Sequence, residues 1–103
     1  MSLNSINLVG AAIDDYRPIS DTFGVFRMVN RHRRGSEEVL FIDVKVFGKL
    51  AEICYDHVRK STRVEVVGRL EFQESEKNGK KYRDYAIIAN DVHFENTFDK
   101  EKD

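Results

Sequence analysis

In the stretch VLFIDVKVFGKL, residues 39–50, two phenylalanines, an aspartate and a lysine alternate with aliphatic residues. In a strand, one face would collect Phe41, Asp43, Lys45 and Phe47, and the other Leu40, Ile42, Val44 and Val46. Exposed rings among cations are typical of surfaces that bind single-stranded nucleic acid, because bases stack on the rings while cations meet phosphates. An outward ring on a small barrel also often packs under a loop or another subunit, so the pattern alone leaves both interpretations open.

Basic residues gather in two further places. Arg27, Arg31, Arg33 and Arg34 fall within eight residues, and a second group comprises Lys77, Lys80, Lys81 and Arg83. The formal net charge of the chain is only −1, but residues 95–103 hold four acids and two bases. The remainder therefore carries a charge of +1, and the sequence predicts local basic patches on a nearly neutral body.

The hydrophobic period predicts which elements carry these residues. Alternation indicates strands over residues 5–13, with Ile6 and Leu8 inward, then from residue 24 to 31, from residue 39, over 62–72 and over 81–94. Residues 14–22 and 32–38 are rich in turn formers, and the Asn78-Gly79 pair predicts a hairpin. Residues 49–60 change to three- and four-residue steps and predict a short helix, with a buried face of Leu50, Ile53, Cys54, His57 and Val58.

Three strands, one helix and two more strands match an all-β oligonucleotide-binding barrel, the OB-fold. This is a five-stranded Greek-key barrel, here with one short helix between its third and fourth strands. Other small β-barrels remain open from the pattern alone. The 103 residues form one domain with 41% hydrophobic residues and a single cysteine, as in a reducing compartment. The sequence has no membrane span or secretory signal, so a cytoplasmic location is expected.

Catalysis is not indicated. His32, His57 and His93 lie far apart without partners at metal-ligand spacing, and the glycines are isolated rather than grouped into a phosphate-binding loop. Asp14 and Asp15 form an acidic pair with no clear third ligand for a metal ion. We therefore expect no enzyme activity, no metal and no cofactor.

Several stretches resemble the bacterial single-stranded DNA-binding protein (SSB) family. They are INLVG, DDYRP and FRMVNR near the start, VFGKLAEICYDHVRK, VEVVGRLEF and NGKKYRDYAI. The resemblance covers roughly residues 5–94, and its most specific parts are residues 47–52 and 68–70. It implies a nucleoid-associated OB-fold homotetramer that wraps single-stranded DNA without sequence preference and protects it during replication, recombination and repair. From the sequence itself the oligomer number is open, and a dimer is possible.

The resemblance also implies roles for individual residues. Phe47 matches a stacking phenylalanine, Phe41 lies where many members have a stacking tryptophan, and Arg34 lies where some have another aromatic. Phosphates would be met by Lys45, Lys49, Arg27, Arg31 and Arg69. The two basic hairpins complete the set of candidate DNA-binding residues with Arg33, Phe72, Lys77, Lys80, Lys81 and Tyr82.

The chain departs from the family in three ways. It has no tryptophan, and Gln73, Glu74, Ser75 and Glu76 stand where members often have an aromatic among basic residues. The family has a long tail with an acidic tip that recruits replication and repair proteins, whereas here a binding domain at 1–94 is followed by a short acidic extension at 95–103. We therefore expect either a short-tailed member, of phage or plasmid origin, or a truncated chain. The alternatives to a single-stranded DNA-binding function are a primosome-type or RNA-binding OB module and an OB scaffold that binds a protein partner.

Overall fold

A computed structural model describes residues 5–31 and 39–94, with the side chain of Arg31 excepted. Its elements in chain order are β1 (Ile6–Ala12), β2 (Arg17–Ser20), β3 (Phe23–Arg31), β4 (Val39–Phe47), α1 (Gly48–His57), β5 (Arg63–Lys77) and β6 (Lys80–Phe94). No helix within these two described ranges is long and apolar enough to cross a membrane.

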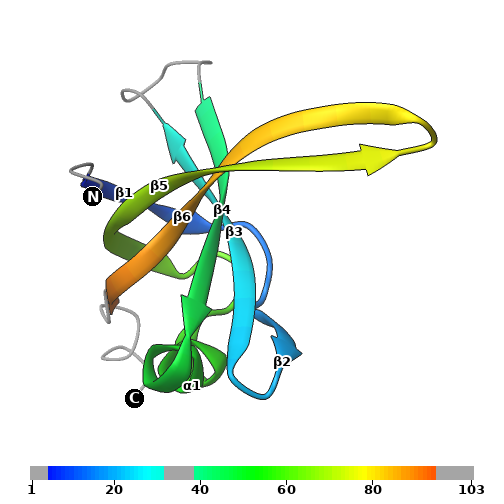
Figure 1. Ribbon diagram of the computed structural model, residues 1–103. Coiled ribbons are helices and arrows are strands. Elements are labelled where there is room, and N and C mark those ends of the chain that lie inside the picture. The colour runs from blue at the N-terminus through cyan, green and yellow to red at the C-terminus, as the bar shows by residue number, and fades with distance from the viewer. Residues whose placement is uncertain (1–4, 32–38, 95–103) are drawn as a thin grey trace, which may run out of the picture.

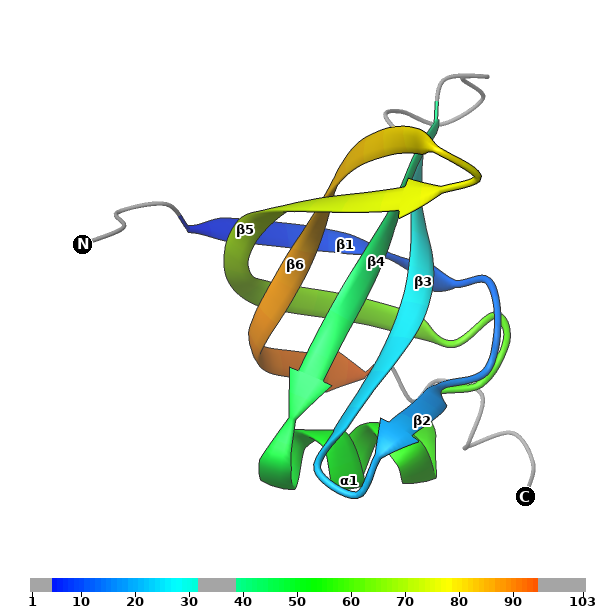
Figure 2. The same cartoon turned by 45° about the vertical axis from the view of Figure 1, so that its right-hand side comes forward.

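The strands form one sheet in the order β1-β5-β6-β4-β3-β2, and β1 also pairs with β3. This last pairing closes the sheet into a barrel, in which β4 and β6 run parallel and the other neighbours antiparallel. Figures 1 and 2 show α1 lying across one end of the barrel, and Figure 1 shows the β5–β6 hairpin extending well beyond its wall. The predicted OB-fold is confirmed.

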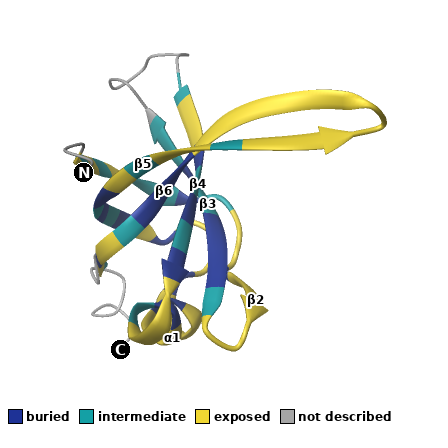
Figure 3. Ribbon diagram, viewed as in Figure 1, coloured by how far each residue is buried: buried dark blue, intermediate teal, exposed yellow. Residues whose placement is uncertain are grey.

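The barrel interior is filled by alternate residues of its strands. Phe26 and Met28 of β3 and Val44 and Val46 of β4 are fully buried, as is Ile87 of β6. Figure 3 shows the buried residues following the barrel strands, whereas the hairpin is exposed almost throughout. Since side chains alternate across a strand, burial of this set turns the intervening residues of β3 and β4 outward.

The helix begins at Gly48 and ends at His57, somewhat earlier than predicted at both ends. Its buried residues are Ala51 and Cys54, followed by the fully buried Val58 just after the helix, while Leu50 packs partly against the core. The prediction that Ile53 and His57 belong to the buried face was wrong, because both are exposed, although the His57 ring lies beside that of Phe94 with centroids 5.3 Å apart.

The connection over residues 14–22 was predicted as a turn only, and this was wrong. Arg17–Ser20 form the exposed edge strand β2, with Arg17 opposite Val25 and Pro18 opposite Gly24. Proline is tolerated there because an edge strand does not need every N–H in its ladder. Leu40 is also 45% exposed rather than buried, because it lies near the start of β4, at the open end of the barrel.

The Asn78-Gly79 turn is confirmed, and both residues have positive φ angles, 55° and 79°. Two-residue turns of this kind match the right-handed twist of a hairpin, so Lys77 pairs directly with Lys80. The strand before the turn continues to Lys77, five residues beyond its predicted end at residue 72. The result is a long two-stranded arm attached to the barrel.

Candidate nucleic-acid interface

The outer face of β4 carries the rings that the alternation predicted there. Phe41 is 48% exposed and Phe47 is 49% exposed, and Lys45 lies between them on the same face. Ile42, at 6% exposure, and its inward neighbours anchor the strand from the other side. Two half-exposed rings on one rigid strand are a surface on which flat ligands can stack.

Phe47 ends β4 and is the residue before the helix. Gly48 has a φ of +62°, which lets the chain turn sharply, and its N–H donates to the carbonyl oxygen of Thr22 at 2.8 Å. Phe23 of β3 lies directly opposite Phe47, and the two rings stack with centroids 4.7 Å apart and an interplanar angle of 19°. The Phe47 ring is therefore oriented by both its backbone and a neighbouring ring.

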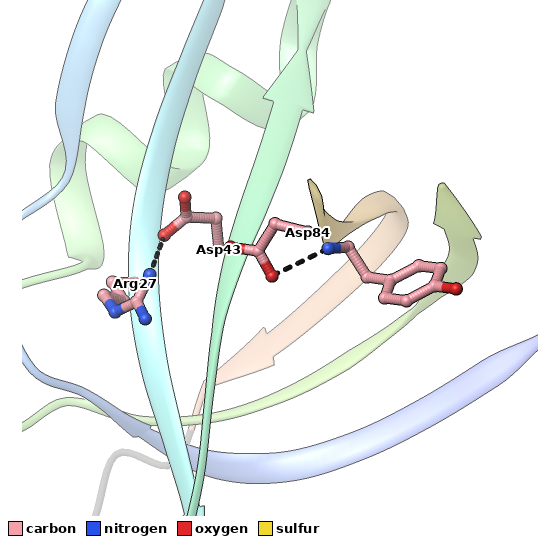
Figure 4. Close-up of polar contacts among 4 residues, drawn as sticks. Arg27, Asp43 and Asp84 are labelled. Atoms are coloured by element: carbon pink, nitrogen blue, oxygen red, sulfur yellow. Dashed lines mark hydrogen bonds and ion pairs between the residues drawn. The ribbon is translucent and has the colours of Figure 1, made fainter. Parts of the chain in front are cut away.

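Phe41 has a cation rather than a ring beside it. The Arg27 guanidinium lies 5.9 Å from the Phe41 ring centroid, and its Nη1 donates to Oδ1 of Asp43 at 2.8 Å (Figure 4). Arg27 was predicted to meet phosphates, but its side chain already has an anionic partner. Its charge is thus largely balanced within the described part of the face.

The β5–β6 hairpin has two faces, and the cross-strand register assigns each side chain to one of them. Arg69 pairs with Ile88, which lies beside Lys45, so Arg69 shares the outer face of β4. Counting by twos from Ile88 brings Tyr82 to this same face. Phe72 pairs with Tyr85 on the opposite side, which continues the barrel interior, and their rings meet edge to face at 5.5 Å.

Acids alternate with bases over the centre of the outer face. The register brings together the bases Arg27, Lys45 and Arg69 and the acids Asp43, Glu71 and Asp84. The Asp84 carboxylate accepts a hydrogen bond from the Tyr85 N–H at 2.8 Å (Figure 4). Formal charges in this central set cancel, so the rings rather than a net positive charge distinguish the surface.

Comparison with known proteins identifies the group to which this surface belongs. The profile of the "Single-strand binding protein family" matches residues 22–95, which include β3, β4, α1, β5 and β6. The chain belongs to this family. The resemblance drawn from the sequence motifs is thereby confirmed, and the family is one of binding proteins rather than enzymes.

Relatives in the family match over part of their length. The chain is 36% identical to a single-stranded DNA-binding protein of Fusobacterium nucleatum over 61 residues, which are 59% of this chain and 40% of that protein. It is 41% identical to one from Aquifex aeolicus over 66 residues, 64% of this chain and 45% of that protein. The matched region thus spans less than half of either relative.

Solved structures agree in fold over nearly the whole chain. A small single-stranded DNA-binding protein from Streptomyces coelicolor superposes with a TM-score of 0.79 at 19% identity, covering 95% of this chain and 99% of that one. An SSB of Plasmodium falciparum in complex with single-stranded DNA gives a TM-score of 0.72 at 22% identity, covering 91% and 96%. At these identities the likeness establishes the barrel architecture.

The sequence-predicted residues divide into four groups. On the outer face with Phe41 and Phe47 lie Lys45, Arg27 and Arg69, and farther along the hairpin Lys77, Lys80 and Tyr82. Lys49 follows in the first turn of α1, with its Nζ 3.7 Å from Oε1 of Glu52. Phe72 and Lys81 belong to the opposite hairpin face, and Arg33, Arg34 and the side chain of Arg31 fall outside the described residues.

Sequence reasoning missed Phe23. The second strand was expected to begin at Gly24 and the preceding turn to end at residue 22, so Phe23 was assigned to neither. Its position opposite Phe47 depends on the β3–β4 register. The only local signal of this register was that one ring stands at the start of β3 and the other at the end of β4.

Proposed function

We propose that the chain binds single-stranded DNA without sequence preference and without catalysis, and protects it during replication, recombination and repair. Bases stack on Phe41 and Phe47, while Lys45 and neighbouring cations meet phosphates. The observation that carries this proposal is the pair of half-exposed rings flanking a lysine on one outer face, in a chain of the single-strand binding family. Stacking suits binding without sequence preference because every base has a π-face.

The path of the strand follows from the same face. It runs along β4 between the two rings and continues past Arg69 onto the hairpin face that carries Tyr82, Lys77 and Lys80. The sequence-based assignments of Lys49, Arg31, Arg33 and Arg34 to phosphate or base contacts remain part of the proposal. Phe72 and Lys81 are the weakest members of the predicted set, because their hairpin face is turned away from Phe47.

The protein is proposed to act as a homo-oligomer, with the homotetramer that the family resemblance implies as the expected state. The first residues of β1 support this. Within the described chain, β1 pairs with β5 on one edge and meets β3 only at Ala11 and Ala12 on the other. The edge before Ala11 can pair with a second copy across a two-fold axis, which would remove an exposed sheet edge.

We propose residues 1–94 as the DNA-binding domain and residues 95–103, which fall outside the described residues, as a short acidic extension. The proposed location is the cytoplasm, in association with the nucleoid.

The function is tested by fluorescence anisotropy of a labelled oligo-dT, with the matched duplex and an RNA oligomer as competitors. The double variant Phe41→Ala, Phe47→Ala should bind about 30-fold or more weakly, since each stacked base contributes roughly 1–3 kcal/mol. Tyr55→Ala is the matched control, because Tyr55 is a 58% exposed ring on α1, away from this face.

Each alternative has its own outcome in this experiment. Binding that is indifferent to both rings, or absent, would reject the stacking proposal and favour an OB scaffold for a protein partner. Tighter binding of RNA would favour the RNA-binding module. Equal affinity for duplex and single strand would show that the surface binds nucleic acid through its charges and does not select single strands.

A further inference from the structure

Phe47 is the only one of the two exposed β4 rings that has another aromatic ring stacked on it within the described residues. The Phe23 and Phe47 rings are nearly parallel, with centroids 4.7 Å apart and 19° between their planes. Phe23 is partly buried beside β2, whereas Phe47 is half exposed. A stacked ring covers one π-face of its neighbour, so the accessible part of Phe47 includes the face turned away from Phe23.

The backbone around this ring pair is fixed on both sides. Phe23 and Phe47 are direct cross-strand partners, and side chains in such pairs are neighbours on the same face of the sheet. One residue farther on, Gly48 donates its N–H to the Thr22 carbonyl oxygen at 2.8 Å. The turn between β2 and β3 is thereby tied to the end of β4, which fixes the backbone positions of the two phenylalanines relative to each other.

Resting on the proposed function, we propose that Phe23 is a positioning residue for single-stranded DNA binding. It covers one face of Phe47 and holds the ring in the orientation in which a base stacks on the other face. The bound base becomes the third layer of a stack that begins at Phe23. Phe47 is thus ordered before the ligand arrives, and ordering a side chain in advance lowers the cost of binding.

A double-mutant cycle tests this assignment. Phe23→Leu removes the ring but keeps an apolar side chain, and it should weaken oligo-dT binding about two- to tenfold. Phe47→Ala alone should weaken it about five- to 150-fold. Because Phe23 acts through Phe47, adding Phe23→Leu to Phe47→Ala should change the dissociation constant less than about twofold.

The controls separate positioning from a general loss of structure. Phe23→Tyr keeps the stacked ring and should bind as wild type does. Tyr55→Leu makes the same kind of ring-to-leucine change on the exposed surface of α1 and should also leave binding unchanged. Thermal unfolding of every variant verifies that the proteins compared are folded.

Fluorescence gives a second test that does not depend on the stability of Phe23→Leu. The chain contains no tryptophan, so Phe47→Trp and Phe23→Trp each introduce a single indole. Oligo-dT should quench the indole strongly in Phe47→Trp, where a base stacks on it directly, and only weakly in Phe23→Trp, one layer below.

The results that overturn the inference differ from those that overturn the function. If wild type binds and depends on Phe47 but not on Phe23, Phe23 has no positioning role and the function stands. If the Phe23 and Phe47 effects multiply, or both indoles are quenched equally, Phe23 contacts DNA directly and the assignment is wrong. If wild type does not bind oligo-dT, the proposed function and this inference fall together.

Discussion

Replacing Asp43 by asparagine should strengthen the binding of single-stranded DNA and make it more sensitive to salt. Asp43 lies on the outer face of β4 between the two exposed rings, where the proposed path brings phosphates past it. Its Oδ1 lies 2.8 Å from Nη1 of Arg27, so it also holds the guanidinium that the sequence assigned to phosphate binding. The substitution keeps the size of the side chain and removes its charge.

The expected magnitude follows from the geometry of the pair. A phosphate about 6 Å from the carboxylate is repelled by about 0.7 kcal/mol in a water-like dielectric, which corresponds to roughly a threefold change in affinity. Once released from Asp43, Arg27 can neutralise a phosphate, and each such contact adds about 0.7 to the slope of log K against log salt for single strands. Folding should change little, because the Arg27 and Asp43 side chains are 40% and 29% exposed and pairs this close to solvent contribute roughly 0–1 kcal/mol.

The assay is oligo-dT anisotropy at several salt concentrations for wild type, Asp43→Asn and Asp56→Asn. Asp56 is an exposed acid on α1, so its variant makes the same change in net charge away from the proposed path. A rise in affinity with a steeper salt slope in Asp43→Asn alone supports the reasoning. Weaker binding would refute it, because Asp43 would then matter by holding Arg27 against Phe41; an equal gain in Asp56→Asn would show a nonspecific effect of net charge.

Three further predictions concern other parts of the structure. Tyr82→Ala should weaken oligo-dT binding at least about fivefold and Phe72→Ala less than about twofold, since the register puts their rings on opposite hairpin faces; similar losses in both would contradict the proposed path. Gly48→Ala should lower the free energy of unfolding by about 1–2 kcal/mol in urea titrations, because its φ of +62° is unfavourable for any residue with a Cβ; an unchanged midpoint would argue against this backbone conformation. Burial raises the pKa of the Cys54 thiol from 9.0 to about 12, so its contribution to stability is complete below pH 9 and is lost as the pH rises toward 12. Between pH 8 and about pH 10 this should cost about 1.4 kcal/mol, and the loss should be absent in Cys54→Ala.

Features set by local sequence were predictable. The period-two pattern of β4 identified which face would carry Phe41 and Phe47, because inward aliphatic residues fix the orientation of a barrel strand. The Asn78-Gly79 pair specified its turn, because asparagine and glycine tolerate the positive φ angles that the turn needs. The order of strands around one helix favoured the OB-fold over other small β-barrels.

Features that depend on partners distant in sequence were not predictable. β2 exists because an exposed tetrapeptide finds the free edge of β3, and nothing in its own composition distinguishes it from a turn. Phe72 continues the alternation of the buried Val64 and Val66, but only the length of the hairpin shows that it leaves the barrel and becomes exposed. The Phe23–Phe47 stack likewise required the register of two strands.

The balance of charges on the outer face determines how its proposed function must work. The central acids Asp43, Glu71 and Asp84 offset the bases interleaved with them, so the release of counterions there provides little of the binding free energy. Stacking on Phe41 and Phe47 must then provide most of the binding free energy in this central part, and the salt dependence of wild type should come from cations outside it, such as Lys77 and Lys80 on the hairpin. The two rings are held accordingly, one by a stacked phenylalanine and the other beside a guanidinium. A surface of this kind distinguishes single strands from duplex by the accessibility of base faces, because both forms of DNA carry the phosphates that a purely basic surface would bind.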